Sequence, residues 1–320
     1  MRLSLEPACR LAIALGLAAG FETPAAAAAQ STQPPQCALV TVASLPMQTE
    51  PDGTVSIPAS INGKPVQFLV DTGGWVSVLS IFFAEASGLQ IKAAATPAIF
   101  MNNVVMSTYA QAKDFNLGAV HGVDLYFYLA NADQMHRDDD GMLAPDIMRH
   151  FDMDFDFAGG KLNAFSPNSC PAAPVYWTHQ NFAQLPLVFD QDFHITADGL
   201  LDGQKVLVTI DTGASRSTMN YEAAQALFGW AEQDPRVKRL PSQRINNGDP
   251  VPIYRYPFGT LALDGVQVLH PDIDMIPQEN YDKEGPKSAQ ITLGMSVLRQ
   301  LHLYIGYEAK TLYISPAEQH

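Results

Sequence analysis

One short pattern occurs twice in this chain of 320 residues and limits how the chain can fold. Residues 66–74 read Val-Gln-Phe-Leu-Val-Asp-Thr-Gly-Gly, and residues 206–214 read Val-Leu-Val-Thr-Ile-Asp-Thr-Gly-Ala. In each copy an apolar run leads into an aspartate, Asp71 or Asp211, and these two residues are 140 positions apart. A single Asp-Thr-Gly is a weak signal. Two copies in the same local setting indicate a duplicated unit whose two halves form one site.

The duplication extends on both sides of this pattern. Asn62-Gly63 precedes the first apolar run and Asp202-Gly203 the second, and both dipeptides favour a tight β-hairpin turn after a strand. Downstream, residues 141–165 and 291–315 repeat with a spacing of 150, and each is predicted to be a strand, one or two helical turns and a hairpin. The sequence therefore predicts an all-β protein with a few short helices.

The two repeats divide the chain into two lobes, residues 30–170 and 171–320. The proline-rich stretch 166–174 is predicted to link them. The remaining elements expected from the pattern are a first strand at 38–42, a short helix at 81–88 and a longer amphipathic helix at 221–230.

The charge of the chain excludes two classes of partner. It carries 33 acidic and 19 basic residues, a net charge of −14. Nucleic acids and anionic membranes both select basic surfaces, so neither is expected to bind this chain.

Residues 1–29 have the pattern of a secretory signal peptide. Arg2 and Arg10 precede the apolar run 11–21, and small residues follow at 25–29. The run is shorter than the roughly 20 apolar residues that span a bilayer, and no later stretch is long and apolar enough. The mature chain is therefore expected to be exported, periplasmic or secreted, with no membrane attachment after cleavage.

Cleavage would remove Cys9 and leave Cys37 and Cys170. In an oxidising compartment two remaining cysteines favour one disulfide, here across the whole first lobe. The alternative is a pair of unpaired buried thiols.

The repeated Asp-Thr-Gly pattern, together with Leu293-Gly294-Met295, resembles the retropepsin-like aspartic proteases. The chain is most similar to the bacterial, exported, single-chain form with two such domains in tandem. The resemblance implies two pepsin-like β-barrel lobes related by a pseudo-two-fold axis, with a cleft between them. It implies that Asp71 and Asp211 are catalytic, and that the residues after them support the active-site loops: Thr72, Gly73, Thr212 and Gly213.

The chemistry of such a pair needs no cofactor and no metal. Two close carboxylates cannot both ionise easily, so they share one proton, activate a water molecule and polarise the substrate carbonyl.

Asp152, Asp154 and Asp156 alternate along a predicted strand, and a solvent-exposed face is expected there in preference to a calcium site. Because one chain supplies both lobes, a monomer acting on a peptide or protein substrate is expected.

The cleft is expected to involve residues next to the aspartates and two Asn-Asn turns in the less regular β-rich stretches, although these turns also fit ordinary surface hairpins. The residues are Gly74, Trp75, Ala214, Ser215, Asn102, Asn103, Asn246 and Asn247. Gly74 and Ala214 stand where pepsin-like enzymes commonly carry a hydroxyl that lowers the pKa of the aspartate. A pH optimum closer to neutral than that of a gastric enzyme is therefore expected.

One departure from the family pattern concerns the first lobe. There Met142-Leu143-Ala144 has alanine where Leu293-Gly294-Met295 has glycine, and Pro145 follows. The added methyl group is expected to affect the geometry of Asp71.

Three interpretations of the whole sequence remain: an active aspartic endopeptidase, an inactive exported relative that binds peptides or proteins, and a structural β-protein in which the Asp-Thr-Gly matches are due to chance. The matched spacings favour the first, and the presence of both aspartates argues against the second.

Overall fold

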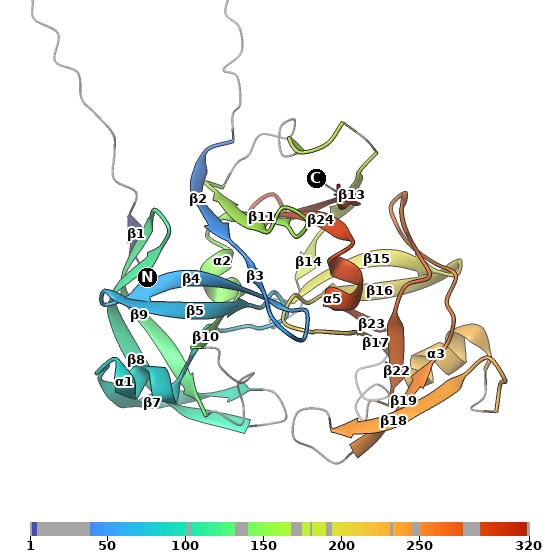
Figure 1. The fold of residues 1–320 in the computed structure, drawn as a ribbon, viewed down its shortest axis with the longest axis horizontal. Helices are drawn as coiled ribbons and strands as arrows, with labels where there is room; N and C mark the ends of the chain where they lie inside the picture. The colour runs from blue at the N-terminus through green and yellow to red at the C-terminus, as the bar shows by residue number, and fades with distance from the viewer. Residues whose placement is uncertain are drawn as a thin grey trace, which may run out of the picture.

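The computed structural model of the chain consists of two β-lobes side by side, with a further sheet between them (Figure 1). This confirms the predicted all-β fold of two pseudo-two-fold-related lobes with few helices. The structure describes residues 2–4, 39–100, 104–131, 140–167, 175–179, 181–189, 194–230, 233–244, 250–277 and 289–318.

The sheet of the first lobe is built on the hairpin that leads to Asp71. Asn62 and Gly63 have φ angles of 50° and 74°, the left-handed values that a two-residue hairpin turn requires. The strands follow the order β1-β9-β6-β10-β5-β4-β8-β7, and β3 pairs with β4. Their bounds are β1 Arg2–Ser4, β3 Gln48–Thr49, β4 Val55–Ile61, β5 Lys64–Val70, β6 Val78–Ser80, β7 Ile91–Phe100, β8 Val104–Leu117, β9 Val120–Ala130 and β10 Gly141–Leu143.

The sheet of the second lobe repeats this arrangement. Asp202 and Gly203 have φ angles of 46° and 80°, so the second predicted hairpin is confirmed as well. The order is β18-β19-β22-β17-β23-β16-β15-β20-β21, and β14 pairs with β15. The bounds are β14 Val188–Phe189, β15 Ile195–Leu201, β16 Gln204–Ile210, β17 Ser217–Asn220, β18 Lys238–Arg244, β19 Pro250–Arg255, β20 Thr260–Leu263, β21 Val266–Leu269, β22 Ile273–Ile276 and β23 Ile291–Leu293.

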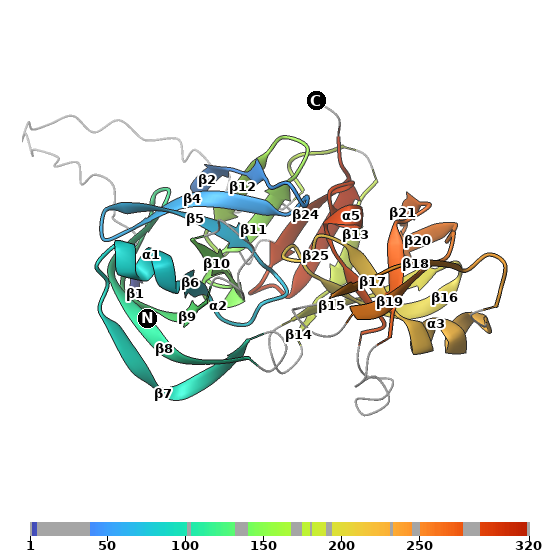
Figure 2. The same cartoon turned by 60° about the horizontal axis from the view of Figure 1, so that its bottom comes forward.

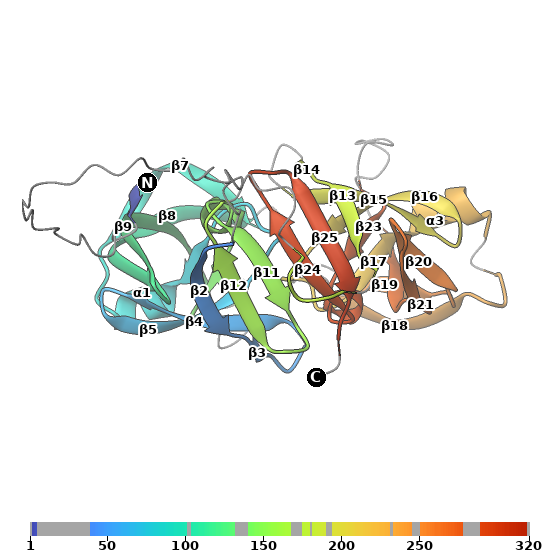
Figure 3. The same ribbon diagram turned by 90° about the horizontal axis from the view of Figure 1, so that it is seen from above.

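A six-stranded sheet joins the lobes and contains strands from both halves of the chain (Figure 3). Its order is β13-β25-β24-β11-β12-β2, with β11 antiparallel to β24 and Asp154 opposite Tyr304. The bounds are β2 Thr41–Pro46, β11 Asp152–Asp156, β12 Lys161–Phe165, β13 Ala183–Pro186, β24 Leu301–Gly306 and β25 Thr311–Pro316. The strand expected at 38–42 thus begins later, because its pairing with β12 starts at Thr41.

The helices are short. α1 (Ile81–Ala86) and α3 (Tyr221–Phe228) lie on the outer sides of the two lobes (Figures 1 and 2), while α2 (Pro145–Met148) and α5 (Met295–Leu298) follow β10 and β23. The Asn220 side chain caps α3 by accepting from the Ala223 N–H at 2.7 Å. The helix ends two residues before the predicted end because Gly229 adopts a left-handed φ of 66°. In the part of the chain that the structure describes, no helix has the length and hydropathy to span a membrane.

The prediction that Asp152, Asp154 and Asp156 form a solvent-exposed face is wrong. Asp152 is 2% exposed and Asp154 is 0% exposed. Two of the partners that make this burial possible come from the other half of the chain: Tyr304 O–H donates to Asp152 Oδ2 at 3.0 Å, and His302 Nε2 lies 2.6 Å from Asp154 Oδ1. Among the described residues, no group of three or more His, Cys, Asp or Glu side chains is placed to hold a metal ion.

Several predicted features lie outside the described residues. They are the apolar part of the segment 1–29, both cysteines of the expected disulfide (Cys37 and Cys170), the turns with Asn102-Asn103 and Asn246-Asn247, and most of the linker 166–174. The hairpins that would carry those turns are described as β7–β8 and β18–β19. Both lie on the side of the molecule opposite the six-stranded sheet (Figure 1).

Candidate active site

Asp71 and Asp211 stand at equivalent positions, each one residue beyond the strand that leads to it. The Asp71 N–H donates to the Leu143 carbonyl at 3.0 Å, and the Asp211 N–H donates to the Leu293 carbonyl at 3.0 Å. These bonds continue the parallel pairings of β5 with β10 and of β16 with β23. Each aspartate is therefore fixed between two adjacent strands of its own lobe.

The two threonines after the aspartates bind the loops to each other across the lobe interface. The Thr72 hydroxyl donates to the Ile210 carbonyl at 2.8 Å and accepts from the Thr212 N–H at 3.0 Å. The Thr212 hydroxyl donates to the Val70 carbonyl at 2.7 Å and accepts from the Thr72 N–H at 3.1 Å. Both threonines are 0% exposed, so solvent does not compete for these four hydrogen bonds.

Each carboxylate accepts two backbone hydrogen bonds from its own loop. Asp71 Oδ1 accepts from the N–H groups of Gly73 and Gly74, both at 2.9 Å. Asp211 Oδ1 accepts from Gly213 at 2.9 Å and from Ala214 at 3.0 Å.

The glycine of each loop lies against the carboxylate of the other loop. A Cβ on Gly73 would be 2.6 Å from Asp211 Oδ1, and one on Gly213 would be 2.6 Å from Asp71 Cγ. Any side chain at these positions would force the loops apart. The structure thus brings six of the predicted site residues together: Asp71, Thr72, Gly73, Asp211, Thr212 and Gly213.

The two carboxyl groups are hydrogen-bonded to each other; Asp71 is buried and Asp211 is partly buried. Burial raises the pKa of Asp71 well above its ordinary value, and the charge of Asp211 raises it further. Burial also raises the pKa of Asp211, while the Ala214 N–H and the bond with Asp71 lower it. Because two close carboxylates cannot both ionise easily, the pair holds one proton that the two residues share.

A family model described as aspartyl protease matches residues 57–146 and 197–297, which together make up more than half of the chain. The chain belongs to the retropepsin-like aspartyl protease family. The two matched regions correspond to its two tandem domains, and each contains one Asp-Thr-Gly loop. The comparison with curated proteins gave no match.

The support of the first aspartyl protease loop differs from that of the second. In the first lobe the Ser77 hydroxyl donates to Asp146 Oδ1 at 2.6 Å and accepts from the Ala144 N–H at 2.9 Å. In the second lobe the equivalent positions are Ser217 and Ser296, whose hydroxyls are 3.1 Å apart. Burial raises the pKa of Asp146, and the Ser77 bonds oppose that shift. The sequence analysis did not identify Asp146 as a site residue. The repeat spacings of 140 and 150 nevertheless relate Ser77 to Ser217 and Asp146 to Ser296.

An ion-pair network beside the second loop was also missed. Both oxygens of Asp274 are used, one by Arg216 Nε at 2.5 Å and the other by Arg255 Nη2 at 2.5 Å. Asp274 is 4% exposed, whereas the side chains of the two arginines are more than one-third exposed. In the first lobe Val76 and Tyr128 occupy the corresponding places, so the two sides of this family fold differ in polarity next to their aspartates.

The other predicted cleft residues follow the aspartates directly. Trp75 is 40% exposed and Ser215 is half-buried, both in the loops that carry the dyad. The Ser215 carbonyl accepts from the Ser296 N–H at 3.1 Å, which ties that loop to α5.

Proposed function

We propose that the protein is an aspartic endopeptidase that hydrolyses peptide bonds with Asp71 and Asp211. The observation that carries the proposal is the mutual hydrogen bond of these two carboxyl groups, one from each lobe. Two such groups supply an acid and a base within reach of a single bound water and a single carbonyl.

In the proposed reaction the ionised carboxylate of the pair takes a proton from a water molecule, and the water oxygen attacks the carbonyl carbon of the substrate. The protonated partner donates its hydrogen to the carbonyl oxygen, so that a neutral tetrahedral diol forms. The carboxyl that took up the water proton then gives it to the amide nitrogen, a diol hydroxyl returns its proton to the other carboxylate, and the carbon–nitrogen bond breaks. The products are a carboxylic acid and an amine, and the dyad returns to its starting state with one shared proton.

The arrangement around the dyad supports this reaction. The four backbone N–H donors hold each Oδ1 in place, so the second oxygen of each carboxylate is left for water and substrate. The threonine bonds between the loops keep the two carboxyl groups at a constant separation. The proposed chemistry calls for no cofactor, and its substrate is a peptide or protein. Because one chain supplies both loops, a monomer is sufficient.

We further propose that the enzyme acts outside the cytoplasm after removal of residues 1–29, as the signal-like pattern of that segment indicates. The N-terminal sequence of the protein recovered from its native host tests this. An N-terminus at Met1 would contradict it.

The deciding experiment is incubation of the mature protein with a denatured protein mixture across pH, beside Asp71→Asn and Asp211→Asn. Cleavage by wild type only is the expected result. The matched control is Asp124→Asn, because Asp124 lies on β9 with a φ of 54°, which asparagine tolerates. Equal cleavage by wild type and both dyad variants would refute the assignment. Binding of peptides without cleavage by wild type would favour the alternative, an inactive peptide- or protein-binding module.

A further inference from the structure

The residues that follow the two catalytic loops are equivalent in position and different in chemistry. Val76 stands five residues after Asp71, and Arg216 stands five residues after Asp211. Val76 is half-buried and packs against an apolar cluster that includes residues of β7 and β8. Arg216 instead enters the ion-pair network around Asp274. The two lobes therefore differ in polarity from the end of each catalytic loop outwards.

Strand register extends this comparison over both lobes. Tyr128 is the counterpart of Asp274, because β9 and β22 run parallel to β6 and β17 with these two residues at equivalent positions. One strand further out, Tyr109 of β8 pairs with Tyr128 as Arg255 of β19 pairs with Asp274. With the residues two positions before Tyr128 and Asp274, the first set is Val76, Tyr109, Tyr126 and Tyr128, called here the tyrosine strip, and the second set is Arg216, Arg255, Asp272 and Asp274, called here the ion-pair strip.

The tyrosine strip offers aromatic surface. Tyr126 is 57% exposed, and its ring meets that of Tyr109 edge to face, with centroids 5.5 Å apart and an interplanar angle of 73°. The Tyr128 hydroxyl donates to the Thr96 carbonyl at 2.7 Å, so its polar end already has a partner. Rings arranged in this way favour contact with another aromatic or apolar side chain.

The ion-pair strip offers hydrogen bonds instead. Arg216 and Arg255 use Nε and Nη2 to bind Asp272 and Asp274, and among the described residues neither Nη1 group makes a hydrogen bond. Each Nη1 carries two N–H donors. The side chains of Arg216, Arg255 and Asp272 are 39%, 38% and 42% exposed. Because two positive and two negative charges cancel, the strip presents both donors and an acceptor without favouring one sign of charge.

The symmetry of the fold places the strips on opposite sides of the dyad. The pseudo-two-fold axis that exchanges Asp71 and Asp211 also exchanges the strips, because their strand pairings are equivalent. An extended peptide with its scissile bond at the dyad would therefore approach one strip with its N-terminal part and the other strip with its C-terminal part.

We propose that the two strips give the enzyme a directional specificity. An aromatic or apolar side chain on one side of the scissile bond packs on the tyrosine strip. On the other side, a neutral carboxamide of glutamine or asparagine binds the ion-pair strip: its oxygen accepts from an arginine Nη1 group, and its nitrogen donates to Asp272. A carboxylate would meet the like charge of Asp272, and an ammonium group would meet the two guanidinium groups. This inference rests on the proposed function, since it concerns the substrate of the same site.

The test is mass-spectrometric mapping of the sites that the mature protein cleaves in a denatured protein mixture. Aromatic or apolar residues are expected to be enriched on one side of the cleaved bonds only, and glutamine and asparagine on the other side only. Synthetic peptides based on one mapped site then give kcat/KM. Replacement of the glutamine by leucine, glutamate or lysine is expected to lower kcat/KM by about tenfold, because each loses part of the hydrogen bonding or adds a repelled charge.

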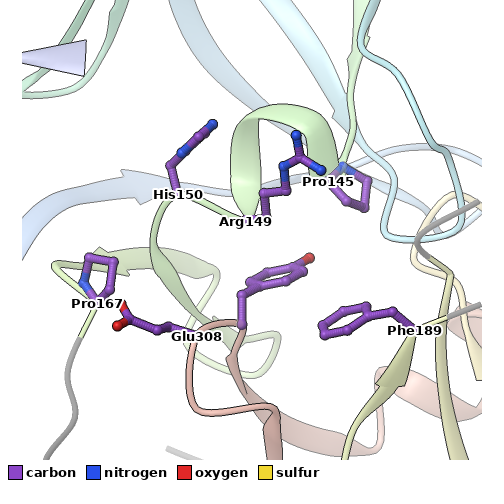
Figure 4. Close-up of a pocket in the computed structure, with 7 residues that line it drawn as sticks. Pro145, Arg149, His150, Pro167, Phe189 and Glu308 are labelled. Atoms are coloured by element: carbon purple, nitrogen blue, oxygen red, sulfur yellow. The ribbon is translucent and has the colours of Figure 1, made fainter. Parts of the chain in front are cut away.

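Variants assign each preference to its strip. Arg216→Val gives the second lobe the residue that the first lobe has at position 76, and it is expected to abolish the carboxamide preference alone. Tyr126→Ala is expected to abolish the aromatic preference alone. Thermal melting shows whether each variant is folded, and Arg255→Gln takes the place of Arg216→Val if the latter does not fold. Arg149→Gln is the matched control, because Arg149 lies on helix α2 at a cavity that no strip residue lines (Figure 4).

Failure of this inference is distinct from failure of the proposed function. Cleavage without one-sided preferences, or with preferences that the strip variants leave unchanged, would overturn the inference and leave the endopeptidase in place. A stronger preference for glutamate or lysine than for glutamine would overturn it as well. Absence of cleavage by wild type would refute the proposed function instead. Selection of displayed peptides on wild type and the same variants then reads the preferences from binding, and retained peptides without both residue types would overturn the inference.

Discussion

The methyl group of Ala144 lies against Gly74, so that a Cβ on Gly74 would be 3.3 Å from it and 2.8 Å from Asp71 Oδ2. The second lobe has the reverse pair, Ala214 and Gly294, and there a Cβ on Gly294 would be 2.4 Å from the Arg216 carbonyl oxygen and 2.5 Å from the Ala214 carbonyl oxygen. The backbone of the second lobe therefore leaves no room for a methyl group at position 294, whereas the first lobe accommodates that of Ala144. Asp71 keeps the same two backbone bonds as Asp211, so the departure at Ala144 is balanced by Gly74.

Pro145 explains why the first lobe accepts alanine. In the second lobe the Met295 N–H donates to the Ala214 carbonyl at 2.8 Å and draws the two segments together. Proline has no N–H, so the equivalent bond cannot form beside Ala144. The segments are therefore not tied at that point.

The first prediction follows from the close approach of Gly74 to the Ala144 methyl group. Gly74→Ala is expected to destabilise the protein by about 1–3 kcal/mol and to lower kcat/KM, because the new methyl group crowds Asp71 and Ala144. Gly74→Ala combined with Ala144→Gly is expected to recover part of the stability. Thermal melting and kinetics of both variants measure this. The idea fails if the double variant is as unstable as the sum of its single variants.

The second prediction concerns the bonds between the loops. Thr72→Val keeps the shape of the side chain but removes a buried hydroxyl that serves the Ile210 carbonyl and the Thr212 N–H. Leaving two buried backbone groups unpaired costs about 1–3 kcal/mol each. Chemical denaturation is expected to show this loss, together with a fall in kcat. Thr72→Ser retains the hydroxyl and is the control, and a serine variant as unstable as the valine variant would contradict the explanation.

The third prediction concerns pH and stability. The folded pKa of Asp71 is raised, so the stabilising contribution of its protonated form is complete below the unfolded pKa of about 4 and is lost as pH rises through the folded value. Asparagine has no proton to lose, so the Asp71→Asn variant does not lose this stability as the pH rises. Its Tm is therefore expected to exceed that of wild type at pH 7, with the difference shrinking towards pH 4. A variant with the same difference at both values would show that the carboxyl is not the cause.

The fourth prediction concerns pH and catalysis. A productive dyad needs one proton, and the raised pKa of Asp71 retains that proton to higher pH than ordinary carboxyl groups would. The profile of kcat/KM against pH is expected to fall only above that raised pKa and to have its optimum closer to neutral than that of a gastric enzyme. Maximal activity below about pH 3 would be the opposite result.

Local sequence information was sufficient to predict the two Asp-Thr-Gly loops. It was insufficient to predict the contacts in the six-stranded sheet that joins the lobes. Asn62-Gly63 and Asp202-Gly203 determine their own backbone conformation, so the hairpins and the position of each aspartate could be predicted from neighbouring residues. Asp154 could not be placed in this way, since its partner His302 is 148 residues away. Acidic residues alternating on a strand indicate exposure only when no other sheet covers them.

The last prediction concerns the six-stranded sheet that joins the two lobes. Asp154 is 0% exposed and accepts from Tyr176 O–H and Asn163 Nδ2, both at 2.8 Å, in addition to its contact with His302. His302→Leu takes away one hydrogen-bond partner of the buried Asp154 side chain, which costs about 1–3 kcal/mol. The free energy of unfolding is expected to fall by about that amount. Adding Asp154→Asn should restore much of it, because an amide costs less to bury with fewer partners than a carboxyl group does. Unchanged unfolding of the single variant would show that the contact between the lobes does not stabilise the fold.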